Sequence, residues 1–346
     1  MEQRSGDLAT RGRAKARPYG LALVALLLGG CTGMAGNTTS TLPPSAIVAT
    51  IPASNPPVLL AVEPNGQHVY AAGDGVLTII DAASNTVVSN VPVNPQSTGI
   101  AAAPNGQRVY VASLFSIMLN QLDTGTNTLQ SPITMFLERL RGGFGFMAVA
   151  PDNQTIYIAN RANQRFGILD LNGGPGSLLT PTVWPVDMKV TPDGKTVVSV
   201  GCKQICTPGF IQLFDATTQL FTQEIKVDGN PYRVVLSPDG SRAYVANLTG
   251  PSLSFVDLTS RQVTNTVAVP SQPTGLAISP DGATLYVASQ TSGAFSVVDV
   301  ASATLRGQLS VPQARDVAVT PDGRRVYVSS GNQVLAIDAQ ALAATP

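Results

Sequence analysis

Residues 275–299 read GLAISPDGATLYVASQTSGAFSVVD and contain a pattern of apolar runs and a turn that indicates β-strands. An apolar run leads into the turn Pro280-Asp281-Gly282, and a second apolar run containing Tyr286 follows. Proline fixes φ, aspartate bonds to its own backbone and glycine accepts a positive φ, so the turn suits a hairpin. A third run alternates and ends at Asp299, and residues 304–309 supply a fourth. The stretch therefore predicts four antiparallel strands.

The same turn occurs seven times along the chain. Successive turns are separated by 40, 47, 41, 46, 42 and 41 residues, and their prolines are Pro64, Pro104, Pro151, Pro192, Pro238, Pro280 and Pro321. A period near 40 residues with strand-type flanks is the signature of propeller blades. The sequence predicts an all-β fold, a seven-bladed β-propeller of four-stranded antiparallel blades, over residues 46–346.

The two ends of this repeat array indicate how the ring closes. The seventh unit has no good fourth strand after Asp338, whereas residues 46–52, before the first turn, look like the fourth strand at 86–92. We expect the N-terminal strand to complete the last blade, which removes an exposed sheet edge.

Two further residues recur in the units. An aspartate ends the third strand, and we expect it to cap the turn that follows rather than bind metal. An aromatic residue recurs in the second strand, where it should pack between neighbouring sheets. The members are Asp81, Asp123, Asp170, Asp215, Asp257, Asp299 and Asp338, and Tyr70, Tyr110, Tyr157, Tyr244, Tyr286 and Tyr327, with Val198 in the fourth unit.

Residues 1–30 have the pattern of a secretory signal. A basic stretch ends at Arg17, and the eight apolar residues 21–28 are too few to span a bilayer as a helix. The following Leu28-Gly29-Gly30-Cys31 resembles the bacterial lipobox, which implies cleavage before Cys31 and acylation of that residue. An ordinary signal peptide with an incidental cysteine is the alternative.

The resemblance to lipoproteins also bears on location. Thr32 rather than aspartate follows the cysteine, which by the sorting rule of Gram-negative lipoproteins implies the outer membrane, facing the periplasm or the cell surface. Residues 31–45 are rich in Gly, Thr, Ser and Pro, so we expect a flexible tether there.

The charge balance argues against one class of partner. The whole chain has 21 basic and 21 acidic residues. Without residues 1–30, which hold five basic and two acidic residues, 16 and 19 remain, a net charge of about −3. A mildly acidic body gives no electrostatic reason to expect nucleic-acid binding.

The repeat as a whole resembles a known family. The combination of Tyr-Val-Ala-Ser/Asn, Val-Val-Asp and Pro-Asp-Gly is similar to the YVTN-type β-propeller repeats of bacterial and archaeal secreted and surface proteins. The resemblance covers about residues 46–340. It implies the propeller fold but says little about activity, because such folds carry many functions.

Charged side chains gather on one face of the predicted ring, where the loops after the second strands and between blades lie. Arginine is well suited to hold an anion there. Solvated loops with mutual ion pairs are the alternative interpretation. The candidate binding face comprises Arg139, Arg141, Arg161, Arg165, Asp187, Tyr232, Arg233, Arg315 and Asp316.

Cysteine and histidine usage narrows the chemistry. Cys202 and Cys206 are the only cysteines apart from Cys31, and export favours a disulfide between them. A zinc site needs about four ligands, but the chain has one histidine, His68, which we place on the opposite face. We expect no metal site. The sequence has no cofactor fingerprint and no catalytic triad, so no cofactor and no catalytic residue are assigned.

These observations favour a non-enzymatic binding or scaffold propeller in the cell envelope. It would engage an envelope protein, a polysaccharide or a small anion through its loop-rich face, with the membrane reached through Cys31. The alternative is a hydrolase that resembles the propeller lactonases and works at the central channel. Asp187, Arg233, Arg315 and Asp316 are the residues near enough to serve it.

Overall fold

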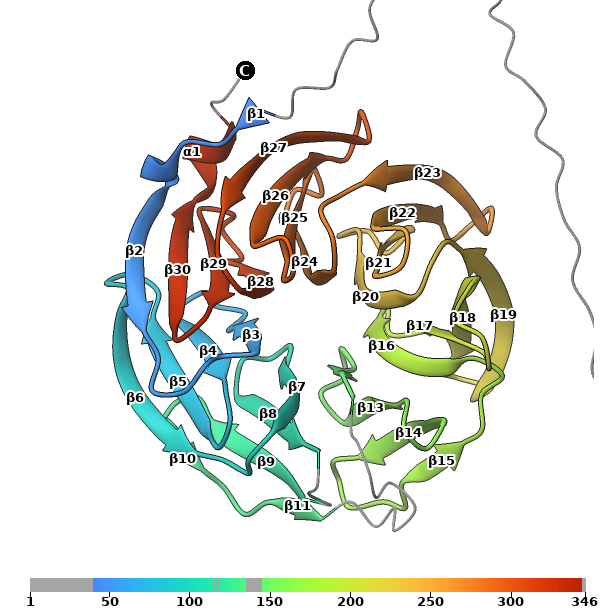
Figure 1. Cartoon of the computed structure of the whole chain (residues 1–346). Coiled ribbons are helices and arrows are strands. Elements are labelled where there is room, and N and C mark those ends of the chain that lie inside the picture. The colour runs from blue at the N-terminus through green and yellow to red at the C-terminus, as the bar shows by residue number, and fades with distance from the viewer. Residues whose placement is uncertain (1–39, 115, 117, 135–144, 344–346) are drawn as a thin grey trace, which may run out of the picture. The chain divides into compact units, whose positions relative to one another are not determined.

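The computed structural model describes residues 40–114, 116, 118–134 and 145–343. Within these ranges the strands form seven antiparallel sheets, which are arranged as blades around a central channel (Figure 1). The predicted seven-bladed β-propeller is confirmed. The described helices are η1 (Pro44–Ala46) and α1 (Ala339–Ala343), and neither is long and apolar enough to cross a membrane.

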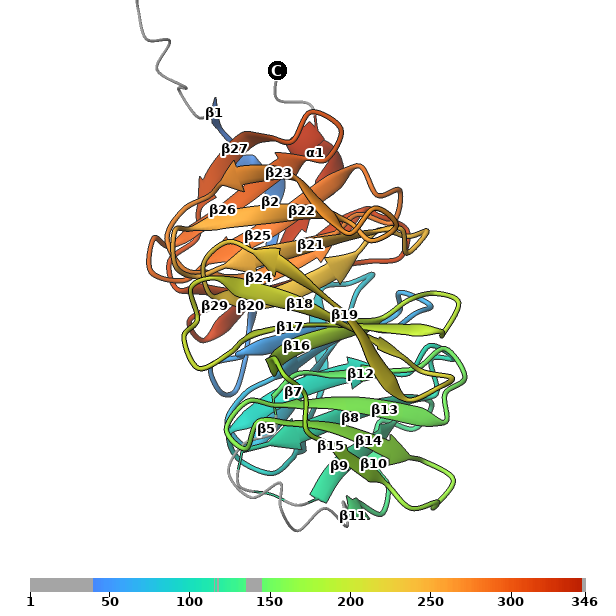
Figure 2. The same ribbon diagram turned by 90° about the vertical axis from the view of Figure 1, so that its right-hand side faces the viewer.

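Blades 1 to 6 follow chain order from the inner strand outward, and Figure 2 shows the blades from the side. The strands of blades 1 to 3 are β3 (Leu59–Val62), β4 (His68–Ala72), β5 (Val76–Asp81) and β6 (Thr86–Pro92); β7 (Ser97–Ala102), β8 (Arg108–Ser113), β9 (Met118–Asp123), β10 (Thr128–Leu129) and β11 (Ile133–Thr134); β12 (Met147–Val149), β13 (Thr155–Asn160), β14 (Arg165–Asp170) and β15 (Ser177–Leu179). In blade 2 the outer position is split, because β10 and β11 both pair with β9.

The strands of blades 4 to 6 are longer. They are β16 (Trp184–Val190), β17 (Thr196–Cys202), β18 (Gly209–Asp215) and β19 (Leu220–Val227); β20 (Pro231–Leu236), β21 (Arg242–Asn247), β22 (Ser252–Asp257) and β23 (Gln262–Ala268); β24 (Pro273–Ile278), β25 (Thr284–Ser289), β26 (Ala294–Asp299) and β27 (Thr304–Ser310).

Blade 7 joins the two ends of the propeller. It consists of β28 (Ala314–Val319), β29 (Arg325–Ser330), β30 (Gln333–Asp338) and the N-terminal β2 (Ile47–Pro52). In Figure 1 the blue β2 lies along the red β30. The two strands are antiparallel, with Ile51 opposite Val334, and Ile51 is 1% exposed. The predicted closure of the ring by the N-terminal strand is confirmed.

The propeller begins earlier than the sequence suggested. Residues 40–45 were expected to be part of a flexible tether, but β1 (Ser40–Thr41) pairs in parallel with β27. The N–H of Leu42 donates to the carbonyl of Gln308 at 2.7 Å, and the Leu42 side chain is buried. Gly307 makes room for it, because a Cβ added there would lie 2.8 Å from Leu42 Cδ2. Residues 40–45 therefore are part of the body, packed on the outside of blade 6.

The repeated aspartates and tyrosines have the structural roles expected of them. Each of the seven aspartates at the end of a third strand accepts a backbone N–H two or three residues later, as Asp81 does from Ser84 at 2.7 Å. The N–H of Ser84 is the main reason that the pKa of Asp81 is lowered. The six second-strand tyrosines are buried. These carboxylates are turn caps, and these rings are packing elements.

Candidate functional site at the mouth of the central channel

One position in each inner strand faces the same level of the channel. On the inner strand, one residue pairs across the sheet with the second-strand tyrosine, or with Val198 in blade 4. The position in question lies two residues before that paired residue. Because the blades repeat, these positions form a ring, and the side chains on it differ sharply in character. In blade order the members of this channel ring are Leu59, Gly99, Phe146, Asp187, Arg233, Gly275 and Asp316.

Arg233 crosses the channel ring. From β20 in blade 5 its Nε donates to the carbonyl of Thr274 at 3.1 Å, and its Nη2 bonds to Asp316 of blade 7. The guanidinium lies 3.9 Å from the ring centroid of Phe146 in blade 3, a cation–π contact. Burial alone would lower the pKa of Arg233, but the charges of Asp316 and Asp187 outweigh it and raise that pKa. Arg233 is therefore a fixed cation that ties four blades together, its own and those of Phe146, Thr274 and Asp316.

The two buried aspartates of the channel ring join neighbouring blades. Oδ2 of Asp316 accepts the N–H of Leu60 in blade 1 at 2.8 Å, and Oδ2 of Asp187 accepts the N–H of Val234 in blade 5 at 2.9 Å. Asp187 also accepts the N–H of Met188 at 2.8 Å. Both carboxylates are buried, with 0% exposure for Asp187 and 3% for Asp316. Both carboxylates thus form hydrogen bonds that hold adjacent blades together.

The glycine at position 275 reflects how closely the blades approach. A Cβ added to Gly275 would lie 2.7 Å from the Cα of Asp316 in the next blade. No side chain fits between them. The glycine thus lets blades 6 and 7 come together at the level where Arg233 meets Asp316.

A cavity of about 330 Å³ lies on the loop-rich side of the channel ring, and every blade contributes to its wall. We call it the vestibule. A second cavity of about 290 Å³ fills the channel on the other side. Leu59, Phe146 and Arg233 line both cavities, so these side chains form the floor of the vestibule.

The vestibule wall holds two cations that are not neutralised. Arg161, on the loop after β13, and Arg315, on β28, both line it. Within the described ranges neither guanidinium makes a salt bridge, whereas Arg233 is paired with Asp316. Arg161 is exposed and Arg315 is half-buried. Two positive charges therefore face a concave space without a counter-ion from the described chain.

Two hydroxyls on the same wall are also unsatisfied. Ser97 and Thr98, at the start of β7 in blade 2, line the vestibule. Their hydroxyl oxygens are buried and have no hydrogen-bond partner in the described residues, and Ser97 is only 7% exposed. Buried polar groups normally make at least one hydrogen bond, to the protein, to a water or to a ligand. The two guanidiniums can hold an anion, and Ser97 and Thr98 lie on the same wall.

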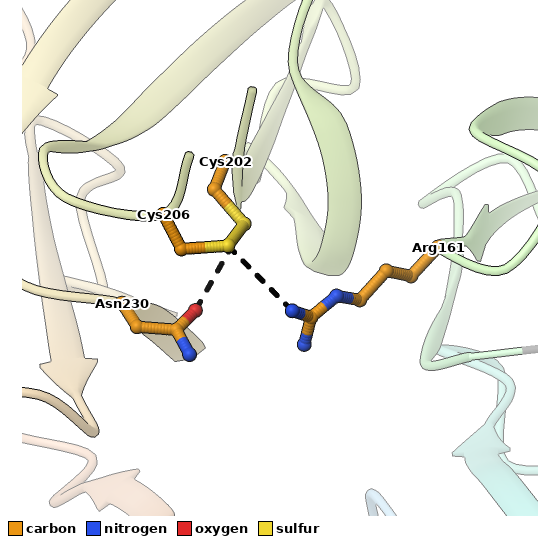
Figure 3. Close-up of a disulfide and its surroundings, with 4 residues drawn as sticks. All are labelled: Arg161, Cys202, Cys206 and Asn230. Carbon is orange, nitrogen blue, oxygen red and sulfur yellow. Dashed lines mark hydrogen bonds between the residues drawn. A yellow bond between two sulfur atoms is a disulfide. The ribbon is translucent and has the colours of Figure 1, made fainter. Parts of the chain in front are cut away.

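A disulfide lies beside Arg161, one of the residues that line the vestibule (Figure 3). Cys202, the last residue of β17, and Cys206, in the loop that follows, are joined by an S–S bond of 2.06 Å. Arg161 reaches toward this loop, with Nη2 donating to Cys206 Sγ at 3.6 Å, and Asn230 Oδ1 lies 3.9 Å from Cys202 Sγ. The bridge is the one that the sequence favoured, and its sulfur helps to place the Arg161 head group.

The candidate binding face predicted from the sequence separates into three groups. Arg161, Tyr232, Arg233 and Arg315 come together in the vestibule. Asp187 and Asp316 lie at the level of the channel ring, bonded to backbone rather than presented to solvent. Arg165 instead bonds to the hydroxyl of Thr180 and does not line the vestibule, while Arg139 and Arg141 lie outside the described residues.

Some vestibule residues were not predicted as site residues. Ser97, Thr98 and Phe146 contribute two hydroxyls and the aromatic floor. Serine and threonine are common throughout the chain, so neither Ser97 nor Thr98 stands out in the sequence. Phe146 aligns with Asp187 and Arg233 in the repeat, and Thr98 aligns with Tyr232 and Arg315, which was the one available signal.

Comparisons with known proteins establish the fold and leave the function open. No protein-family model matches the chain, and no curated protein matches it. Among solved structures, hydrazine synthase from Kuenenia stuttgartiensis is similar, with a TM-score of 0.74 and 16% identity over 90% of this chain and 99% of that one. At this identity the likeness shows a shared β-propeller fold alone.

Proposed function

We propose that this protein is a binding propeller whose vestibule holds a small organic anion. The observation that carries the proposal is the pair of guanidiniums, Arg161 and Arg315, that line one cavity and have no salt bridge among the described residues. Arginine forms strong, charge-assisted hydrogen bonds with anionic groups. A concave site with an apolar floor and a few polar groups is typical of small-molecule recognition.

Binding is better supported than hydrolysis at the channel. A lactonase-like mechanism would need a carboxylate free to act as a base or to hold a metal. Asp187 and Asp316 are the acidic members of the candidate face, and both accept backbone N–H groups from the next blade. Using either one in catalysis would break contacts that join the blades.

The binding is testable by thermal unfolding at low ionic strength. We expect organic anions to raise the melting temperature, because a ligand at 100 times its Kd stabilises the folded state by about 2.7 kcal/mol. The double variant Arg161→Met/Arg315→Met should lose this rise, whereas Arg242→Met, at the far end of β21, should keep it. A rise that survives in the double variant would rule out the vestibule, and stabilisation by neutral oligosaccharides alone would favour a polysaccharide partner.

We further propose that the propeller is a lipoprotein of the YVTN-type repeat class, anchored at Cys31 to the outer membrane. The lipobox-like Leu28-Gly29-Gly30-Cys31 and the basic and apolar pattern before it support this, and these residues lie outside the described ranges. Metabolic labelling with a palmitate analogue should tag the wild-type protein. Cys31→Ser should remove the label completely, and a labelled Cys31→Ser protein would exclude this anchor.

A further inference from the structure

We infer that the ligand of the vestibule is a short dicarboxylate, held by one guanidinium at each end. The inference rests on the proposed anion-binding function and specifies its ligand. It follows from where the two free cations lie, what lies between them and how large the space is.

The two free guanidiniums lie on nearly opposite sides of the channel. Arg161 belongs to blade 3 and Arg315 to blade 7, which are three blades apart in a closed ring of seven. Both line the same cavity. A ligand with one anionic group can neutralise one of them, and the other then stays unpaired. A ligand with two separated anionic groups neutralises both.

The third guanidinium of the vestibule does not change this count. Arg233 already bonds to Asp316 and donates to the carbonyl of Thr274, so its charge is compensated by the protein. Counted over the described part of the chain, the vestibule therefore offers two uncompensated positive charges. Two carboxylates, each with a single negative charge, match them one to one.

The surface between the two arginines suits a short carbon chain. Leu59 and Phe146 form an apolar floor, and Ser97 and Thr98 lie in blade 2, on the arc that runs from blade 7 to blade 3 through blade 1. A chain of methylene groups can rest on this apolar floor. A cavity of about 330 Å³ is at the small end of the range for ligand pockets.

Carboxylates match the two ends of the vestibule, at Arg161 and Arg315, better than phosphates do. A phosphate carries up to two negative charges and is commonly bound by clustered backbone N–H groups or a helix N-terminus. Each end of the vestibule instead has a single arginine as its unpaired cation, and a guanidinium matches a carboxylate in a bidentate pair. The geometry thus points to two carboxylates rather than two phosphates.

Calorimetric titration of the purified protein tests this directly. The probes are linear dicarboxylates of four to eight carbons, monocarboxylates of equal length, and alkane bisphosphates of equal span. We expect at least one dicarboxylate to bind about 10- to 100-fold more tightly than its monocarboxylate partner, because the second charge-assisted bond is made only by the diacid. Arg161→Met and Arg315→Met should each reduce dicarboxylate affinity to the monocarboxylate level, and Arg242→Met should leave it unchanged.

The outcomes separate the ligand class from the binding function. Equal affinity for mono- and dicarboxylates would overturn the two-ended ligand and leave the anion-binding function standing. Tighter binding of the bisphosphates would overturn the carboxylate assignment. If no probe binds and no anion stabilises the protein in the thermal test, both the ligand class and the proposed function are wrong. Circular dichroism spectra of each variant check that the propeller is folded.

Discussion

Arg233→Met is expected to lower the free energy of unfolding by about 3–5 kcal/mol, the usual cost of removing one partner of a buried ion pair. The loss arises because Asp316 stays buried and charged, 3% exposed, after its cation is gone. The variant also loses the cation–π contact with Phe146 and the hydrogen bond to Thr274. Urea unfolding followed by circular dichroism measures the change.

Two further variants make this prediction specific. Arg233→Met/Asp316→Asn should recover about 1–2 kcal/mol, because asparagine removes the buried charge and can still accept the N–H of Leu60. Arg325→Met breaks a pair with Asp338 at 2.9 Å whose side chains are 33% and 29% exposed, and should cost at most about 1 kcal/mol. Equal losses for Arg233→Met and Arg325→Met would show that the channel pair is no more important than a surface one.

Ile51→Asp is expected to be the most destabilising single change in the closing strand. Ile51 is 1% exposed and lies opposite Val334 in the β2–β30 pair. Losing such a side chain costs about 2–5 kcal/mol, and burying an unpaired carboxylate adds several more. The sum is comparable with the total stability of a typical domain, about 5–15 kcal/mol. We expect cooperative unfolding to be lost or the urea midpoint to fall by at least half.

The same strand supplies the control. Val48 is 46% exposed and lies at the register shift between Ile47 and Ala49. Val48→Asp introduces the same charge on the same strand, but on its solvent side, and should change stability by less than about 1 kcal/mol. If the two aspartate variants unfold alike, β2 does not pack into blade 7 as described.

The fold was predictable because its information is local and repeated. Each Pro-Asp/Asn turn prescribes one hairpin through its own backbone chemistry, and seven copies at a near-constant period leave few alternatives. The closure was predictable because the seventh unit lacks a strand that the N-terminus supplies. Leu42 was not predictable. It is one apolar residue among threonine, serine and proline, and its binding place depends on Gly307, far along the chain.

The site was predictable in position but not in detail. Aligning the repeats places Asp187, Arg233 and Asp316 at one level of the channel, since equivalent residues occupy equivalent places. The alignment does not say which charges are paired. Arg233 meets an aspartate 83 residues away, and Asp187 accepts an N–H 47 residues away, so both contacts depend on how far a side chain reaches between blades. That neither Arg161 nor Arg315 forms a salt bridge with the described residues can be seen only in the assembled ring.

The proposed function requires that Arg161 and Arg315 hold an organic anion in the vestibule. Nuclear magnetic resonance of protein labelled with ¹⁵N-arginine tests it most directly, with the Nε–H signals assigned through Arg161→Met, Arg315→Met and Arg242→Met. Titration with the dicarboxylate that gives the largest thermal shift should move the signals of Arg161 and Arg315 along one saturable curve and leave Arg242 in place. Saturable movement confined to other arginines, or no movement at Arg161 and Arg315 at saturating ligand, would contradict the account.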